Sequence, residues 1–285
     1  MLVDASYTVP LLKVTQGLDD AFADDAVATE EPLEIRLIYG ALTHRQTQNV
    51  AVTMRTPGHD AELALGFLFT EGIIHHQEDV LTAQHAFIAC AENRENVIVV
   101  ELQPHAVPNL GKAERNFYTT SSCGVCGKAS IGAIRTVSSY AGTHNDDLTI
   151  DAETLYQLPH ILRHHQEIFE STGGLHASAL FTLDGQLVEL REDVGRHNAL
   201  DKLIGVSLNN NWLPVVDKVL LLSGRISFEL VQKAAMAGIS IIAAIGAPSS
   251  LAVQLAQEFN ITLVGFLRQQ RFNIYTAAYR VKTAL

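Results

Sequence analysis

The order of apolar and polar residues differs between the two halves of the chain. In the N-terminal half it predicts strands at Glu34–Tyr39, Val50–Met54 and Asn96–Leu102, and a helix at Ala61–Phe69. Asp60 directly precedes this helix and can cap its free amides. Together these elements predict a small α+β unit.

From Phe117 onward, short apolar runs rich in β-branched residues alternate with amphipathic segments. The predicted strands are Ala177–Leu183, Gln186–Arg191, Val219–Leu222, Ser240–Ala244 and Ile261–Val264. The predicted helices are Ala129–Ser138, Ala152–Phe169, Arg196–Val206, Phe228–Ala237 and Leu251–Phe259. Asp184-Gly185 predicts a hairpin between the first two strands. The later alternation predicts βαβ units in a sheet covered on both faces, so the fold class is α/β.

These patterns divide the chain into three regions. Residues 1–31 end in an acidic, alanine-rich stretch and are predicted to be a loosely attached arm. Residues 32–116 form the smaller α+β domain, and residues 117–285 form the larger domain. The polar, proline-containing segment Pro104–Glu114 is the candidate linker.

Composition narrows the class of protein. The chain has 285 residues, of which 47% are hydrophobic and 18% charged, as is typical of soluble globular proteins. A net charge of −11 argues against non-specific binding to nucleic acid or to an anionic membrane. No signal peptide is evident, no apolar run is long enough to span a bilayer, and three cysteines give no disulfide framework. These observations favour the cytoplasm.

Two of the three cysteines lie in Ser121–Lys128, spaced C-x-x-C before a predicted helix. Cys123 is the first of the pair, and helix amides together with Lys128 would favour its thiolate. Two such thiols can form a disulfide, bind a metal or carry reactive sulfur. A metal is disfavoured because a second C-x-x-C pair and the H-x-E motif of zinc deaminases are both absent. We therefore predict no metal site, with Cys123 and Cys126 as the catalytic candidates.

Two loops after predicted strands are suited to anions. Ser223, Gly224, Arg225 and Ser227 follow one strand, and the segment 246–250 follows the next. Because the carboxyl ends of parallel strands meet at one edge of a sheet, both loops should lie together there. Hydroxyls, free amides and a guanidinium at that edge would bind phosphate.

Two further segments carry candidate ligand groups. The run 191–202 is dense in functional side chains, including His197, and suits either an exposed capped helix or a ligand site. A second group follows the strand Ile261–Val264 in a predicted loop and comprises Phe266, Leu267, Arg268, Gln269, Gln270 and Arg271. Two arginines at a sheet edge can grip a phosphate. His176 receives no proton-transfer role, because a lone histidine is more often structural.

Several segments together resemble one family, the formate dehydrogenase accessory sulfurtransferases known as FdhD. The matching runs are Arg55-Thr56-Pro57-Gly58, Glu62-Leu63-Ala64, Gly66-Phe67-Leu68, Glu71-Gly72-Ile73, Ser122–Gly127, Gly173–Ala177, Glu192–Lys202 and Ser223–Glu229. The run Glu192–Lys202 is the most specific of them. The resemblance covers nearly the whole chain beyond the arm.

The resemblance implies a specific activity and fold. Members of this family accept sulfur from a cysteine desulfurase as a cysteine persulfide, and pass it to the molybdenum bis-(molybdopterin guanine dinucleotide) cofactor that formate dehydrogenase requires. It also implies a homodimer and a C-terminal cytidine-deaminase-like three-layer αβα domain. Cys123 then corresponds to the persulfide cysteine, with Cys126 as its partner. A GDP-like guanine nucleotide would mimic the bound cofactor.

The family's cofactor-contacting segment corresponds to Phe266–Arg271. Here the chain has Gln269-Gln270 where a Pro-Gly pair is common in the family, although Arg271 is retained. The phosphates are expected at the loops 223–227 and 246–250. Two alternatives remain from the residues themselves: a thiol–disulfide oxidoreductase, and a non-catalytic chaperone that binds the molybdenum cofactor.

Overall fold

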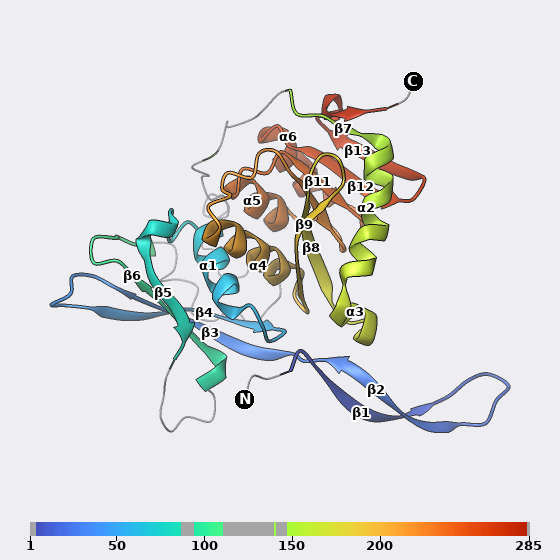
Figure 1. The fold of residues 1–285 in the computed structure, drawn as a ribbon, viewed down its shortest axis with the longest axis horizontal. Coiled ribbons are helices and arrows are strands. Elements are labelled where there is room, and N and C mark those ends of the chain that lie inside the picture. Colours follow the sequence, from blue (N-terminus) through green and yellow to red (C-terminus); the bar gives the residue numbers. More distant parts are fainter. Residues whose placement is uncertain (1–3, 87–93, 111–139, 141–146, 284–285) are drawn as a thin grey trace.

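The computed structural model describes residues 4–86, 94–110, 140 and 147–283 (Figure 1). The central feature is a six-stranded sheet with the strand order β13-β12-β11-β10-β8-β9. Its strands are β8 (His176–Phe181), β9 (Leu187–Asp193), β10 (Val219–Leu222), β11 (Ile241–Ala244), β12 (Thr262–Arg268) and β13 (Arg271–Thr276). Strands β10, β11 and β12 are parallel, while β8, β9 and β13 pair antiparallel with their neighbours. The predicted βαβ units and the Asp184-Gly185 hairpin are confirmed.

Helices cover both faces of this sheet. One face carries α4 (Arg196–Asn209), α5 (Phe228–Met236) and α6 (Ser250–Glu258), and the other carries α2 (Ala152–His165) with α3 (Glu167–Thr172) at its end (Figure 1). Successive strand residues point to opposite faces, so Leu220 and Leu222 lie in one apolar cluster and Val219 and Leu221 in the other. A short parallel pair, β7 (Ile150–Asp151) with β14 (Val281–Lys282), and the 3-10 turn Ala278–Arg280 lie near the C-terminus.

A second sheet, ordered β4-β3-β6-β5, forms the N-terminal unit. Its elements are β3 (Glu31–Tyr39), β4 (Gln46–Arg55), α1 (Asp60–Thr70), β5 (Val80–His85) and β6 (Val97–Leu102), with 3-10 turns at Gln77–Asp79 and Arg94–Asn96. Helix α1 crosses α4 at two glycines. A Cβ on Gly66 would lie 1.8 Å from the Asp201 carbonyl oxygen, and one on Gly205 would lie 1.9 Å from the Glu62 carbonyl oxygen. The two units thus share one apolar core.

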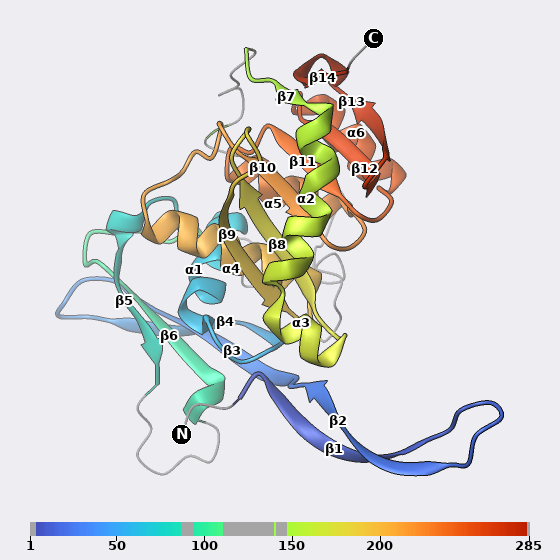
Figure 2. The same ribbon diagram turned by 45° about the vertical axis from the view of Figure 1, so that its right-hand side comes forward.

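The N-terminal arm is more regular than the sequence predicted. Strands β1 (Ser6–Lys13) and β2 (Ala21–Ala28) form an antiparallel ribbon that projects from the body (Figures 1 and 2). Its root is held by the Thr29 amide, which donates to the Ala5 carbonyl at 2.9 Å, and by the Thr29 hydroxyl, which donates to the Asp4 carbonyl at 2.7 Å. Cross-strand hydrogen bonds therefore order a segment whose acidic composition predicted no strands.

Two other sequence predictions need correction, and three fall outside the described residues. Asp60 does not cap α1 but lies buried, with its carboxylate 3.0 Å from the Arg55 guanidinium. The helix predicted at Ala152–Phe169 is two helices that separate at Gln166. The helix predicted at Ala129–Ser138, the last residues of the candidate linker and the boundary at residues 116 and 117 lie outside the described residues. Among the described helices, none has the length and apolar character needed to cross a membrane.

Candidate functional site

The carboxyl ends of β10 and β11 meet at one edge of the central sheet, where the loops that follow them bind each other. The Gly246 amide donates to the Gly224 carbonyl at 3.0 Å. The Ile226 amide donates to the Ala247 carbonyl at 3.0 Å, and the Ser249 amide donates to the Ile226 carbonyl at 2.9 Å. The two loops predicted to share an edge therefore do so.

This interlocking uses backbone groups that were candidates for binding phosphate. The Ser223 amide donates to the Ala177 carbonyl at 3.0 Å, and the Ser223 hydroxyl accepts from the Ala177 amide at 2.8 Å. The hydroxyl proton of Ser223 can still be donated to a ligand. Ser227 is the N-cap of α5, and its side chain accepts no hydrogen bond from the helix amides, so the first turn of α5 retains free donors. A ligand would therefore bind the start of α5 rather than the whole loop.

Four groups that can carry positive charge gather at this edge: His176, Arg196, His197 and Arg225. Because β8 is antiparallel to β10, His176 at the start of β8 lies beside the end of β10, and its Nδ1 is 3.1 Å from where a Cβ of Gly224 would lie. Burial lowers the pKa of His176, and the charges of Arg196 and Arg225 lower it further. The arginines thus supply a permanent positive charge, while the histidine tends to remain neutral.

Both arginines of this cationic edge have hydrogen-bond donors that no other described residue uses. The Arg225 side chain is exposed and makes no hydrogen bond or ion pair with any other described residue. Nε of Arg196 is buried and has no hydrogen-bond partner among the described residues. Because a buried donor without a partner is costly, an anionic ligand at this edge would relieve that cost.

Contacts with the N-terminal unit hold the turn that precedes Arg196 and His197. The buried carboxylate of Asp193 accepts from the Gly195 amide at 2.8 Å and from the Thr56 amide at 3.2 Å. It also lies 2.7 Å from the Lys202 ammonium group. Burial raises the pKa of Asp193, against the opposing charge of Lys202.

Asn198 completes this connection between the two units. Its Nδ2 donates to the Met54 carbonyl at 2.7 Å, and its Oδ1 accepts from the Thr53 hydroxyl at 3.1 Å. The run 191–202 is therefore neither an exposed helix face nor wholly a ligand site. Most of its polar groups join the two units, and Arg196 and His197 face the edge.

His197 lies in the first turn of α4, and its side chain contacts the start of α5. Its Nε2 is 3.2 Å from the Ser227 hydroxyl and 2.9 Å from Oε2 of Glu229. These contacts fix the ring beside the first turn of α5, so His197 lies at the predicted edge, together with Ser227.

The segment 266–271 is a hairpin rather than the predicted loop. Strand β12 continues to Arg268, Arg268 pairs with Arg271, and Gln269 and Gln270 form the two-residue turn. Phe266 adopts a positive φ of 54° at an irregularity of the strand pair and is 43% exposed.

The hairpin joins the same edge through its backbone. The Phe266 amide donates to the Gly246 carbonyl at 3.0 Å, and the Arg268 guanidinium donates to the Ile245 carbonyl at 2.6 Å. Leu267 is fully buried in the core, so its side chain cannot meet a ligand. Phe266, Gln269, Gln270 and Arg271 remain exposed and available.

Comparison with known proteins decides the family. The model of the FdhD/NarQ family matches residues 28–282. The chain belongs to the FdhD/NarQ family. A protein of Mycolicibacterium paratuberculosis named sulfur carrier protein FdhD is 53% identical over 264 residues, which cover 90% of this chain and 92% of that protein. A protein of the same name from Sulfolobus acidocaldarius is 42% identical over 275 residues, 96% of this chain and 97% of its own length.

A solved structure supports the fold of this family member. It is a protein of Desulfotalea psychrophila provisionally named a formate dehydrogenase accessory protein, with a TM-score of 0.71 and 23% identity. The match covers 98% of this chain and 100% of that one. At this identity the likeness concerns the fold alone.

The cysteine motif that the family resemblance places at the centre of function, Cys123 and Cys126, lies outside the described residues. Among the described residues, no group of three or more histidine, cysteine, aspartate or glutamate side chains is arranged to hold a metal ion.

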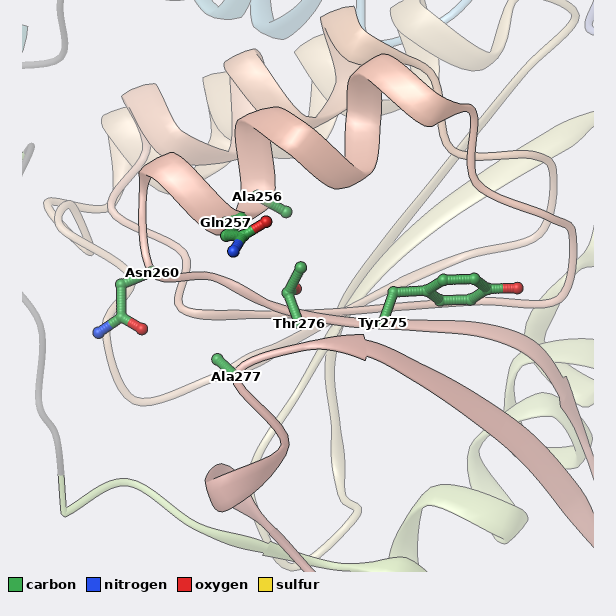
Figure 3. Close-up of a pocket in the computed structure, with 6 residues that line it drawn as sticks. All are labelled: Ala256, Gln257, Asn260, Tyr275, Thr276 and Ala277. Atoms are coloured by element: carbon green, nitrogen blue, oxygen red, sulfur yellow. The ribbon is translucent and has the colours of Figure 1, made fainter.

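Two hollows of the described surface lie away from this edge. A pocket of about 240 Å³ beside the C-terminal end of α6 is lined by Ala256, Gln257, Asn260, Tyr275, Thr276 and Ala277 (Figure 3). A groove of about 940 Å³ runs along the root of the arm. Neither includes a predicted ligand residue. The strand ends are the better guide to the site, because free helix amides and guanidinium groups recognise anions on an open surface.

From the sequence, Arg196 was noted in the turn after Gly195 as suited to ligand recognition but was not assigned to the site, and His176 was given no role. The signal for Arg196 is its place at a strand-to-helix turn, where Gly195-Arg196 stands as Gly224-Arg225 does. The position of His176 depends on the antiparallel pairing of β8 with β10, which the local sequence does not encode.

Proposed function

We propose that this protein is a cytoplasmic sulfur carrier that serves formate dehydrogenase. It accepts sulfur from a cysteine desulfurase as a persulfide on Cys123, and transfers it to the molybdenum bis-(molybdopterin guanine dinucleotide) cofactor. Membership of the family and the names of its relatives support sulfur carriage. The proposal also includes the persulfide on Cys123, the desulfurase as donor, the molybdenum cofactor as acceptor, and a homodimeric state.

The observation that carries the cofactor half of the proposal is the cationic edge. The protein has a net charge of −11, yet Arg196 and Arg225 converge where free amides begin α5. The acceptor carries two guanine nucleotides, each joined to a pterin through a pyrophosphate, and these groups need concentrated positive charge on an otherwise acidic protein. Phe266, exposed on the hairpin, offers a ring on which a base can stack.

The sulfur-loading step balances without an added oxidant. The Cys123 thiolate attacks the outer sulfur of the donor's cysteine persulfide, and a new sulfur–sulfur bond forms on Cys123. The donor's own sulfur–sulfur bond breaks, and its cysteine leaves as a thiolate. Cys126 has a supporting role in this proposal.

Mass spectrometry tests the loading step. After incubation with a cysteine desulfurase and cysteine, the wild-type protein should gain a mass of one sulfur, and the Cys123→Ala variant should not. Cys90→Ala is the matched control and should load normally. A Cys123→Ala protein that gains the same sulfur and still supports formate dehydrogenase would end the proposal.

Nucleotide titration tests the cofactor site. GDP should bind the wild type, and Arg225→Ala should weaken binding by about 10- to 150-fold, because one charge-assisted contact contributes about 1.5–3 kcal/mol. The affinity of the Arg271→Ala variant for GDP reports whether the hairpin contributes to nucleotide binding. Lys218→Ala is the control, since Lys218 precedes β10 at the opposite end of the strand from Arg225. If GDP does not bind the wild type, the assignment of this edge is wrong.

A further inference from the structure

The projecting arm exposes apolar side chains that no described element covers. Phe22 is 91% exposed, Leu18 71%, Val14 70%, Tyr7 57% and Leu12 50%. In a soluble monomer, isolated exposed apolar residues are ordinary, but a cluster on one projecting element marks an interaction surface.

The pairing register places apolar groups on both faces of the ribbon. Leu12 is opposite Phe22 on one face, while Tyr7 is opposite Val27 on the other. The ribbon has only two strands, and an isolated two-stranded ribbon is marginally stable in water. Its outer edges also pair with no other described strand, so they can accept a further strand. A partner would thus stabilise the arm as well as bind it.

We propose that the arm is the docking surface for the protein that donates sulfur, and that this donor presents a basic surface with apolar side chains. The inference rests on the proposed function, and it assigns the surface on which the donor binds before sulfur is transferred to Cys123. Charge selects the occupant, because Asp19, Asp20, Asp24 and Asp25 accompany only Lys13 between residues 6 and 28. Two such acidic arms would repel each other, so the arms of a homodimer would not pair with one another, whereas a basic partner would be attracted.

The arm is also close to the candidate site. Helix α3 packs against β2, and a Cβ on Gly174 would lie 3.4 Å from Cβ of Ala28. Only Leu175 separates Gly174 from His176 at the cationic edge. The groove of about 940 Å³ at the root, lined partly by Tyr7 and Val27, adds a concave surface to the ribbon.

This placement favours the donor over the recipient of the cofactor. A basic partner is attracted to the arm and repelled by Arg196 and Arg225, so it docks beside the edge and leaves the edge free for its anionic ligand. In the proposed function the donor has to reach Cys123 and not the edge, whereas a recipient must reach the edge itself to remove the cofactor.

Sulfur loading with two different donors tests the docking. A cysteine desulfurase with cysteine is the protein donor, and sodium polysulfide is the small-molecule donor. Loading is followed by mass spectrometry at increasing concentrations of the protein. Two arm variants are compared with the wild type: Phe22→Ser, and a second in which the four arm aspartates are changed (Asp19→Asn, Asp20→Asn, Asp24→Asn, Asp25→Asn). Leu42→Ser is the control, because Leu42 is 75% exposed and lies between β3 and β4, outside the arm.

Both arm variants should require about tenfold more protein for half-maximal loading from the desulfurase, as expected when a charged or central apolar contact is lost. The aspartate variant should also lose the salt dependence of the wild type. Loading from polysulfide should be unchanged in all proteins. Unchanged loading of the arm variants from the desulfurase would overturn the docking proposal and leave the proposed function intact. If the wild type takes sulfur from neither donor, the proposed function fails and the assigned partner fails with it.

Discussion

Buried charged residues explain why the run 191–202 was ambiguous from sequence alone. Its helix and its N-terminal glycine were predictable, because Gly195 separates a strand pattern from a helical one. The burial of Lys202 and Asp201 was not, because each depends on a partner far along the chain. Lys233 lies 2.9 Å from the Asp201 carboxylate, and the Lys202 ammonium donates to the Thr56 carbonyl at 2.9 Å.

The pair of Lys202 and Asp193 should be essential to stability. Lys202→Met leaves the Asp193 carboxylate buried without its counter-charge, and removal of one partner of a buried pair costs about 3–5 kcal/mol. Urea unfolding measures this loss. Lys218→Met removes a partner from the exposed pair with Asp217 and should cost less than about 0.5 kcal/mol. Equal losses from both variants would contradict the buried role of Lys202.

Glu62 should make stability depend on acid pH. Burial alone would raise its pKa, but hydrogen bonds and charge from His59 and Arg191 prevail and lower it from 4.5 to about 2. The ionised form therefore stabilises the fold above pH 4.5, and this contribution is lost as the pH falls towards 2.

The variant Glu62→Gln, which removes the charge of this side chain, tests the pH dependence. It should be less stable than the wild type at pH 7 by about 1–2 kcal/mol after allowance for solvent screening. The difference should narrow as the pH falls from 4.5 to 2. Glu153→Gln, exposed in the first turn of α2, should lose only the weak interaction with the helix dipole, about 0.3–1 kcal/mol. A difference that stays constant with pH would exclude this role for Glu62.

Elements that are buried on both faces were the easiest to predict. Strand β10 matches its predicted bounds, because an apolar run of this length between polar turns is too short for a helix and fits a buried strand. Strands β5 and β13 were missed because they lie at sheet edges and carry many polar residues. At the candidate site, the two strand-end loops were predictable from strand order, whereas the hairpin at 266–271 depends on an edge strand that the pattern does not mark.

The crossing of α1 and α4 depends on the absence of side chains. Gly205→Ala would place a methyl carbon 1.9 Å from a backbone oxygen, so the helices must separate. Overpacking costs about 1–3 kcal/mol, and this variant should reach the upper end because backbone cannot rotate away. Gly174→Ala is the control, since its nearest contact at 3.4 Å is ordinary. Thermal unfolding distinguishes the two, and a Gly205→Ala protein as stable as the wild type would show that the helices are not in close contact.

At the scale of the whole molecule, the two units should unfold together. They share one apolar cluster, and Asp193, Asn198 and Lys202 bind the backbone or side chains of the N-terminal unit. Trp212, the single tryptophan, reports on the end of α4, while far-UV circular dichroism reports on both sheets. The two signals should give one coincident transition in urea. Two separate midpoints would show that the units are independent.

The interlocked loops at the candidate site have a consequence for mutational tolerance. Their mutual hydrogen bonds join backbone amides to backbone carbonyls, so replacing most of their side chains leaves these bonds in place. An alanine scan of the edge would therefore report on side chains that are proposed to contact the ligand, such as Arg225, but overlook the backbone framework that positions them. Gly246 is the exception, because any side chain there meets the opposing loop. Evolution can thus replace the other side chains of this edge, and with them the preferred ligand, while Gly246 must remain glycine.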